Sequence, residues 1–446
     1  MSSRRAFLRG TAVGVAVASL PRVGGAQPTS SLPPSGGAQP PPASPPPSIA
    51  ALQSMRALAK PITREERLAR IEKARRLMTE HRLDAIAMMG GTSLVYFANI
   101  RWWNSERLFL MVLPAKGAPF FVCPAFEEDR AREQIAAGPL GTNAEIRTWQ
   151  EDEDPYALVA AGLKDRGMAG GRLGIEEKTF FNFAHGVAQA APALQVVSAT
   201  PVTAGCRMIK SAHEIELMRL ASKVTLTAYA AAFRALRDGM TQGDFSALVS
   251  QAHARLGFQG SAGAQVGIYS ALPHGSLTPQ VIRDGSIILI DGGCSVEGYS
   301  SDLSRTFVLG KATDKMKQVF DIVHRAERAA LEAARPGVPL DAIDAAARRV
   351  ITEAGYGPGF KYFTHRVGHG LGMDGHEWPY LAKNNMFGWT RSLAAAQGMT
   401  FSDEPGIYIR GEFGVRLEDD MLVTPEGAEL LTPPSPSIED PFQGVR

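Results

Sequence analysis

Two segments in the C-terminal half of the chain each place a pair of acidic residues within apolar, strand-like sequence. In the first segment, the β-branched run 286–290 ends at Asp291, and Asp302 lies on the following strand-like run. The midpoint between the two aspartates falls at Val296-Glu297, next to a glycine. A hairpin that turns there places Asp291 and Asp302 side by side across its two strands.

The second segment repeats this pattern with glutamates. Glu404 precedes one apolar run, Glu418 follows another, and their midpoint is Gly411, a natural turn residue. Four carboxylates in apolar surroundings would repel one another, and burying them without partners costs a large amount of free energy. Divalent cations resolve that conflict. His369, flanked by glycines that allow close backbone approach, adds a nitrogen donor.

Four carboxylates and one imidazole favour hard or borderline divalent ions such as Mn²⁺, Co²⁺, Fe²⁺ or Zn²⁺. Two ions bridged by shared carboxylates can activate a water molecule and polarise a carbonyl group. A single strand-end aspartate is weak evidence, because solvated acids are common at such positions. The five residues in this order and spacing predict a dinuclear metal centre.

These residues resemble the pita-bread metallopeptidases, and most closely their Xaa-Pro peptidase branch, over residues 60–434. The motifs are IDGGCSVEGYSSDLSRTF, HRVGHGLGMDGHEWP and DEPGIYIRGEFGVRLED. The resemblance implies an α/β N-terminal domain of the creatinase/prolidase type, followed by an α+β pita-bread catalytic domain with an internal pseudo-twofold. It also implies two divalent metal ions, with Mn²⁺ preferred. The implied metal ligands are Asp291, Asp302, His369, Glu404 and Glu418.

Four further positions match the family outside the metal ligands: His274, His365, His376 and Arg416. The resemblance implies a metal-bridging hydroxide that attacks the carbonyl before proline, with Glu404 as the proton shuttle. His365 and His376 would hydrogen-bond the substrate carbonyl and the developing oxyanion, and His274 would act near the leaving imino group. Arg416 would hold acidic residues in position.

The folded chain divides into two domains. Alternating strand and helix patterns predict an α/β domain over residues 60–206. In the catalytic domain, expected over residues 207–434, Arg237-Asp238-Gly239-Met240 is echoed 98 residues later by Arg335-Pro336-Gly337-Val338. This echo indicates two related halves with a site where they meet. Residues 435–446 are expected to form a C-terminal tail.

The N-terminus has the layout of an export signal. Arg4 and Arg5 precede a short apolar stretch and then small residues, which predicts a twin-arginine signal peptide over residues 1–26 and a periplasmic location. A disordered basic tail is the alternative. The segment 27–59 is expected to be a proline-rich linker, because residues 27–50 contain nine prolines and no charge.

Composition excludes several other classes of protein. The formal net charge is +2, and the four arginines of residues 1–50 leave the rest of the chain at −2, which argues against nucleic-acid binding. No apolar run is long enough for a membrane span. The three cysteines, Cys123, Cys206 and Cys294, are far apart and are expected to be small buried side chains.

Three functional hypotheses follow. The first is an Xaa-Pro aminopeptidase or dipeptidase that acts on peptides with proline in the second position and forms a homodimer. The second keeps the scaffold but acts on a small molecule, as a dimethylsulfoniopropionate-type lyase or a C–N hydrolase. The third is a non-catalytic binding protein. Asp403, Trp378 and the connection 380–397 depart from the family pattern and bear on substrate choice rather than on metal binding.

Overall fold

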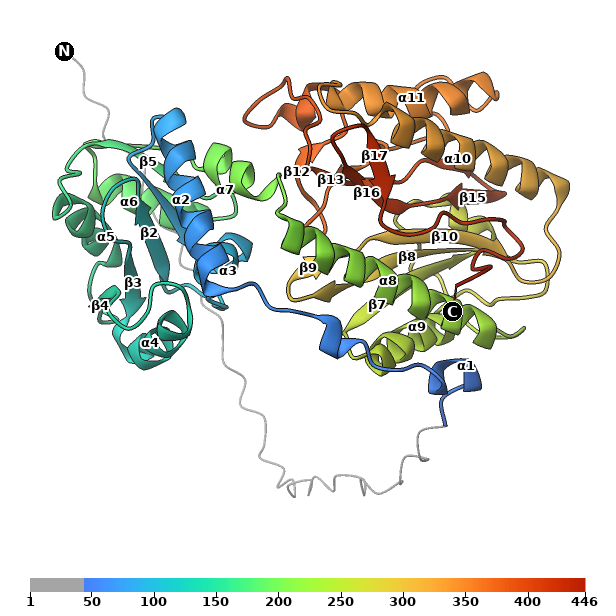
Figure 1. The fold of residues 1–446 in the computed structure, drawn as a ribbon, viewed down its shortest axis with the longest axis horizontal. Helices are drawn as coiled ribbons and strands as arrows, with labels where there is room; N and C mark the ends of the chain where they lie inside the picture. The colour runs from blue at the N-terminus through green and yellow to red at the C-terminus, as the bar shows by residue number, and fades with distance from the viewer. Residues whose placement is uncertain (1–43, 446) are drawn as a thin grey trace, which may run out of the picture. The chain divides into compact units, whose positions relative to one another are not determined.

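The computed structural model describes residues 44–445, so the predicted signal peptide and most of the predicted linker lie outside the described residues. An N-terminal α/β part and a larger C-terminal part follow each other along the chain (Figure 1). Among the described residues, no helix has the length and apolar character needed to cross a membrane.

The N-terminal part is built on one six-stranded sheet in the order β4-β3-β2-β1-β5-β6. The strand pairs β3–β4, β1–β5 and β5–β6 are parallel, whereas β2 runs antiparallel to both of its neighbours. The strands are β1 (Ala85–Met89), β2 (Leu110–Pro114), β3 (Phe120–Pro124), β4 (Glu145–Trp149), β5 (Gly171–Ile175) and β6 (Leu194–Ser198). The helices are α2 (Arg64–Glu80), α3 (Thr92–Ala98), α4 (Glu128–Ala137), α5 (Pro155–Lys164), α6 (Phe181–Ala190) and α7 (Thr200–Arg207).

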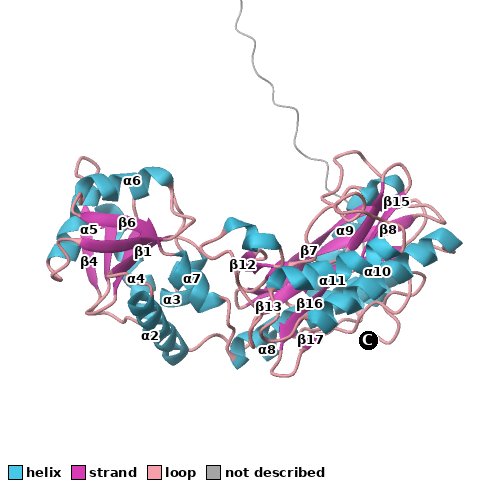
Figure 2. Cartoon of the chain, turned by 90° about the horizontal axis from the view of Figure 1, so that it is seen from above, coloured by secondary structure: helices cyan, strands magenta, loops and turns pink. Residues whose placement is uncertain are grey.

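Both faces of this sheet are covered by helices (Figure 2). Side chains of β1 alternate between two apolar clusters, because successive residues of a strand point to opposite faces. Ile86 and Met88 pack with α2, α4 and α7, whereas Ala85, Ala87 and Met89 pack with α5 and α6. Strand β1 is therefore buried on both faces, as its uninterrupted apolar sequence indicates.

The inner strands β1, β2 and β3 are apolar and buried along their whole length, whereas β4 and β6 are not. These two strands end the sheet, and most of their residues are exposed or half-buried. An edge strand with little buried surface lacks the apolar run on which a strand prediction depends.

The C-terminal part contains two helix pairs and three small sheets. The helices are α8 (Ala212–Ala235), α9 (Gln242–Leu256), α10 (Asp314–Ala333) and α11 (Leu340–Glu353). The strands are β7 (Gly260–Val266), β8 (Ile287–Val296), β9 (Tyr299–Ser300), β10 (Leu303–Val308), β11 (His369–Gly370), β12 (Glu377–Tyr380), β13 (Thr400–Asp403), β14 (Gly406–Ile409), β15 (Phe413–Arg416), β16 (Asp419–Val423) and β17 (Ala428–Leu430). The sheets have the orders β10-β8-β7, with β9 on β8, then β12-β11-β13-β16-β17, and β14-β15.

The predicted echo corresponds to a repeated helix–turn–helix unit. Helices α8 and α10 end 98 residues apart, and helices α9 and α11 begin 98 residues apart. Gly239 and Gly337 occupy the same left-handed conformation in the two turns, with φ of 87° and 85°. Gly257 and Gly355, with φ of 93° and 91°, follow the second helix of each pair. The two halves therefore share their turn geometry, and Figure 1 shows the helix pairs on opposite sides of the strands.

The predicted linker extends too far into the folded chain. Helix α1 (Pro47–Ala50) buries Ile49, and the Ser48 hydroxyl donates to the carbonyl of Ala231 in α8 at 2.8 Å. The backbone N–H of Met55 donates to the carbonyl of Leu256 at 2.8 Å. A few apolar residues at the end of a proline-rich stretch are sufficient for packing when an apolar helix face is available nearby.

The predicted tail is also partly a packed segment. Ile438 and Phe442 are each 3% exposed and belong to the apolar clusters of the catalytic part. The carbonyl of Ile438 accepts a hydrogen bond from the backbone N–H of Val308 at 3.0 Å. Residues 435–442 therefore cover strand β10 rather than extending away from the fold.

Short 3₁₀ turns complete the described chain: Arg56–Leu58, Ala125–Glu127, Gly267–Ala271 and Lys383–Phe387.

Candidate active site

The first predicted hairpin forms, but its turn lies one residue later than expected, so the pairing register differs by two residues. Its tight turn is Glu297-Gly298, where both residues have positive φ, 51° and 91°, as a two-residue hairpin turn requires. Ser304 therefore lies directly opposite Asp291, and Asp302 lies diagonally across from it. Because Asp302 and Ser304 are two residues apart, both acidic side chains still share one face of the sheet.

The second hairpin has the predicted register. Strands β13 and β16 pair from Thr400 opposite Leu422 onward, and the same register continues in β14 and β15. Glu404 and Glu418 face each other in the short gap between these two paired stretches. Gly411, with φ of 84°, lies in the connecting turn.

A backbone bridge joins the two hairpins. The N–H of Glu418 donates to the carbonyl of Ser304 at 3.1 Å, and the N–H of Ser304 donates to the carbonyl of Glu418 at 3.3 Å. The Ser304 hydroxyl lies 2.5 Å from Glu418 Oε2 and 3.1 Å from Asp291 Oδ1. This bridge brings the acidic pairs of the two hairpins to one place.

All nine site residues predicted from the sequence line a single cavity of about 160 Å³, together with Arg366. The lining residues are His274, Asp291, Asp302, His365, Arg366, His369, His376, Glu404, Arg416 and Glu418.

The donor set of this cavity fits metal ions. In two groups, the donor atoms lie within 4.8 Å of one another: Asp291, Asp302 and Glu418 form one group, and His369, Glu404 and Glu418 form the other. Glu418 belongs to both groups. Nδ1 of His369 lies 3.1 Å from the carbonyl of Gly370, so Nδ1 carries the proton and Nε2 offers its lone pair towards Glu404 Oε1 at 3.3 Å.

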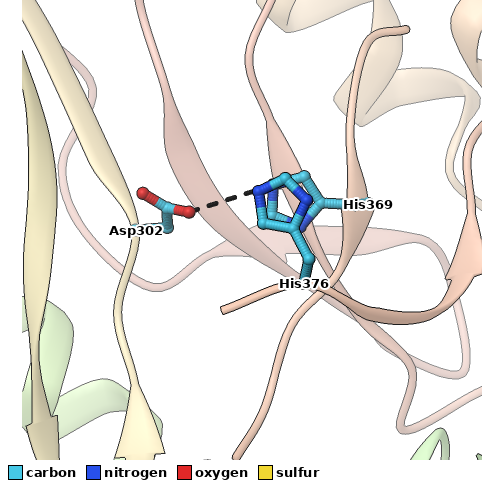
Figure 3. A group of neighbouring side chains, drawn as sticks. All are labelled: Asp302, His369 and His376. Carbon is cyan, nitrogen blue, oxygen red and sulfur yellow. Dashed lines mark ion pairs between the residues drawn. The ribbon is translucent and has the colours of Figure 1, made fainter. Parts of the chain in front are cut away.

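A third group contains Asp302, His369 and His376 (Figure 3). The rings of His369 and His376 are stacked with centroids 3.6 Å apart, and His369 Nε2 lies 3.8 Å from Asp302 Oδ2. Nδ1 of His376 accepts a hydrogen bond from Arg366 at 3.2 Å. Nε2 of His376 therefore carries the proton and is free to donate.

The acidic side chains of the site repel one another. Burial and the charge of Asp291 raise the pKa of Asp302 well above its usual range. Burial and the charge of Asp302 do the same to the pKa of Glu418. Burial raises the pKa of Glu404 to about 7, against the opposing effect of Arg416. Burial lowers the pKa of His369 to about 3, so this imidazole is a neutral donor. The arrangement is one that divalent cations stabilise.

Arg416 links the acidic residues to the remainder of the cavity. Its NH2 group donates to Asp291 Oδ2 at 2.6 Å, and its Nε donates to the Ser304 hydroxyl at 2.9 Å. Its NH1 group donates to the carbonyl of Pro273 at 3.0 Å, which fixes the segment that carries His274. The predicted role of Arg416 in holding acidic residues is consistent with these contacts.

His365 has contacts that differ from the expected ones. Its Nδ1 lies 2.8 Å from the carbonyl of Arg366 and must therefore carry the proton, which makes Nε2 the acceptor for the hydroxyl of Tyr408 at 2.7 Å. Burial lowers the pKa of His365 to about 3. This neutral ring has no free N–H for a substrate carbonyl, and instead it orients Tyr408, which also contacts Arg416 at 3.1 Å.

Sequence reasoning missed Arg366, Tyr408 and Ser304. Ser304 could have been found, since it lies two residues after Asp302 on the same strand face. Arg366 is adjacent to His365, but its contact with His376 depends on the folding of the intervening chain. No local signal distinguishes Tyr408 from other strand tyrosines.

Comparisons with known proteins identify the family. Residues 216–425 match the model of metallopeptidase family M24, and residues 70–209 match the creatinase/prolidase N-terminal domain. The chain is 37% identical over 351 residues to the probable dipeptidase PepE of Mycobacterium tuberculosis (strain ATCC 25618 / H37Rv), covering 78% of this chain and 89% of that one. It is 31% identical over 378 residues to the Xaa-Pro dipeptidase of Lactobacillus delbrueckii subsp. lactis, covering 83% and 98%.

Solved structures agree with this assignment. The dipeptidase PepE from Mycobacterium ulcerans superposes with a TM-score of 0.77 at 31% identity, over 85% of this chain and 98% of that one. The dipeptidase from Pyrococcus horikoshii OT3 superposes with a TM-score of 0.72 at 30% identity, over 83% and 99%.

The fold is thus a creatinase-type α/β domain followed by a pita-bread catalytic domain, the architecture of a metallopeptidase. The chain belongs to metallopeptidase family M24 and is an enzyme similar to Xaa-Pro dipeptidases. The family implies divalent metal ions and a peptide substrate.

Proposed function

We propose that this enzyme hydrolyses the peptide bond before proline, with Xaa-Pro dipeptides as its preferred substrates. The observation that carries the proposal is the convergence of five metal donors, His274, His376 and Arg416 on one small cavity. The preference for dipeptides is supported by relatives and solved structures that are named dipeptidases or Xaa-Pro dipeptidases.

Two divalent ions, Mn²⁺ by preference and Co²⁺, Zn²⁺ or Fe²⁺ otherwise, would be held by Asp291, Asp302, His369, Glu404 and Glu418. When bound, they lower the pKa of a water molecule and polarise the scissile carbonyl. Glu418 is 2% exposed and belongs to both donor groups, so its carboxylate would contribute to holding the ions.

Glu404 moves the proton. Glu404 lies in the cavity with Oε1 3.3 Å from His369 Nε2, and its carboxylate is placed to accept a proton from the attacking water and to release it again. We assign it the transfer from the attacking water to the proline nitrogen.

His376 and His274 act on the substrate. The free Nε2–H of His376 is suited to donate to the oxyanion that develops at the scissile carbonyl. His274 lines the cavity next to Pro273, whose carbonyl accepts a hydrogen bond from Arg416, and is suited to orient the proline end of the substrate. His365 contributes indirectly, by holding Tyr408 against Arg416.

The test uses the chain from residue 27 loaded with Mn²⁺ and follows proline release from Ala-Pro alongside cleavage of Ala-Pro-Ala. The Asp291→Ala variant is the blank. We expect cleavage before proline that the variant lacks, with faster turnover of the dipeptide. Comparable turnover of the tripeptide would indicate an aminopeptidase. No cleavage of either peptide by protein that holds two metal equivalents would contradict the proposal and favour the small-molecule lyase or hydrolase.

We propose export to the periplasm by the twin-arginine route, supported by the Arg4-Arg5 pair and the apolar stretch that follows it. Replacement of both arginines by lysine should abolish export in fractionated cells.

We also propose a homodimer, supported by the family resemblance, and light scattering of the purified chain gives the mass that checks it.

A further inference from the structure

His376 lies on the short β11–β12 hairpin. The contacts of the His376 side chain do little to fix the position of this hairpin. Residues 371–376 connect β11 to β12, and the His376 side chain is exposed. Its contacts are the stack on His369 and the hydrogen bond from Arg366. The location of the imidazole therefore depends on what holds the backbone on either side of it.

Asp374, two residues before His376, is held by three groups of the N-terminal domain. The Thr92 hydroxyl donates to its Oδ1 at 2.6 Å. Lys178 Nζ and Arg207 NH2 both donate to its Oδ2, each at 2.7 Å. Arg207 and Lys178 lower the pKa of Asp374 despite its burial, so it is ionised at neutral pH. One carboxylate thus connects the hairpin to three separate points of the other domain.

The residues after His376 are anchored to the same domain. Glu377, whose side chain is 2% exposed, pairs with Arg207 of α7 at 3.0 Å and with Lys210, in the connection between the two domains, at 2.7 Å. The indole N–H of Trp378 donates to Glu177 Oε2 at 3.2 Å. His376 is therefore enclosed between two anchored stretches of backbone.

The topology of the N-terminal sheet explains why these groups converge. Strands β1 and β5 are parallel neighbours, so their carboxyl ends lie at the same edge of the sheet. Thr92 begins helix α3 just after β1, whereas Glu177 and Lys178 follow β5. The edge that binds ligands in many open α/β sheets here binds the hairpin of the catalytic domain.

We propose that Asp374 is a positioning residue for catalysis: through it, the N-terminal domain sets the place of His376 and thereby kcat. The inference rests on the proposed function, in which His376 donates to the substrate. Charge-assisted hydrogen bonds from three donors restrict the backbone of the hairpin. Displacement of a catalytic group by about 1 Å can reduce turnover by up to about 100-fold.

The first experiment compares Asp374→Asn, Thr92→Val and Thr92→Ser with the Mn²⁺-loaded wild type on Ala-Pro. We expect kcat to fall about tenfold in Asp374→Asn and about threefold in Thr92→Val, with KM within about twofold and metal content unchanged. Thr92→Ser, which keeps the hydroxyl, should retain wild-type kcat. His213→Gln is the matched control, because it removes a different contact between domains, at Glu66, and should leave kcat within about twofold.

The second experiment separates positioning from general stability by a double-mutant cycle with His376→Ala. If Asp374 acts through His376, Asp374→Asn reduces kcat less than about twofold further in the His376→Ala background. A full tenfold reduction in both backgrounds would overturn the inference.

Amide hydrogen exchange of residues 371–377 gives a readout that does not depend on activity. Asp374→Asn should accelerate exchange there, and His213→Gln should not. If the wild type fails to cleave Ala-Pro, the proposed function fails, but the exchange result still decides whether Asp374 holds the hairpin. Unchanged exchange in Asp374→Asn would contradict that.

Discussion

Two groups of acidic side chains, one on the β11–β12 hairpin and one in the cavity, differ in charge balance. The first group, Asp374 and Glu377, faces three cationic side chains at 2.7–3.0 Å: Lys178, Arg207 and Lys210. The second group consists of four carboxylates that contact Arg416 and neutral histidines: Asp291, Asp302, Glu404 and Glu418.

The consequence appears in the pKa values. Neighbouring cations lower the pKa of Asp374, whereas burial and neighbouring acids raise those of Asp302 and Glu418. Buried carboxylates with enough cationic partners form a structural network. The same side chains without partners form a site for divalent cations. Charge balance, rather than burial or residue type, separates the two regions.

The largest expected effect comes from removing an acid of the unbalanced group. Glu418→Gln removes the carboxylate shared by both donor groups, so we expect kcat/KM to fall by at least about 1000-fold, or about 4 kcal/mol, with less than two metal equivalents bound. Metal analysis and Ala-Pro kinetics check this. Glu429→Gln on the neighbouring strand β17 is the control, and a Glu418→Gln enzyme with two metals and normal activity would contradict the assignment.

Replacing one carboxylate by an amide should have opposite effects on the stability of the metal-free protein in the two acidic groups. Glu377→Gln leaves Lys210 and Arg207 buried with less compensation and should lower the free energy of unfolding by about 3 kcal/mol. Glu418→Gln removes a repelling charge and should not lower it. Urea unfolding in the presence of chelator measures both, and equal destabilisation by the two variants would refute the comparison.

The stabilisation by metal should increase with pH. The pKa of Glu404 is raised from 4.5 to about 7, so its contribution to the stability of metal-free protein is present below pH 4.5 and is lost as the pH rises through 7. Metal ions bind the ionised form and offset that loss. The rise in melting temperature caused by Mn²⁺ should therefore be a few degrees larger at pH 7.5 than at pH 5.5. A smaller rise at pH 7.5 would show that Glu404 is not a ligand.

The smallest effect is expected at an exposed ion pair beside the turn of the hairpin that carries Glu404 and Glu418. Lys315 and Glu412 lie 2.5 Å apart, but each side chain is 48% exposed. Lys315→Met should change the free energy of unfolding by less than about 0.5 kcal/mol and leave kcat unchanged, because solvent screens the pair. A change in the free energy of unfolding as large as that expected for Glu377→Gln would mean that the distance between two charges matters more than their burial.

Much of the site could be predicted because its parts are local. The hairpin of Glu404 and Glu418 follows from apolar runs around a central glycine, and its register is as expected. The capping boxes at Thr63 and Ser211 mark the beginnings of α2 and α8. The turn of the first hairpin lies one residue later than predicted, because symmetry about a midpoint does not reveal which two residues adopt positive φ.

The parts that could not be predicted involve contacts between distant segments. Thr92 and Asp374 are 282 residues apart in the sequence, and neither lies in a pattern that indicates the other. The tautomer of His365 depends on Tyr408, 43 residues later. Edge strands β4 and β6 lack an apolar run and are strands only because the sheet supplies hydrogen-bonding partners.

Four features follow from the sequence alone: the candidate donor residues, the hairpins that carry them, the repeated helix pairs and the family. Each of these is specified by side-chain type and by spacing within one or two elements. The tertiary structure alone decided the bridge between Ser304 and Glu418, the charge balance of the two acidic groups and the anchoring of the His376 hairpin. These depend on which distant charges meet in a buried environment, and electrostatic energies there follow from three-dimensional distance rather than from order along the chain.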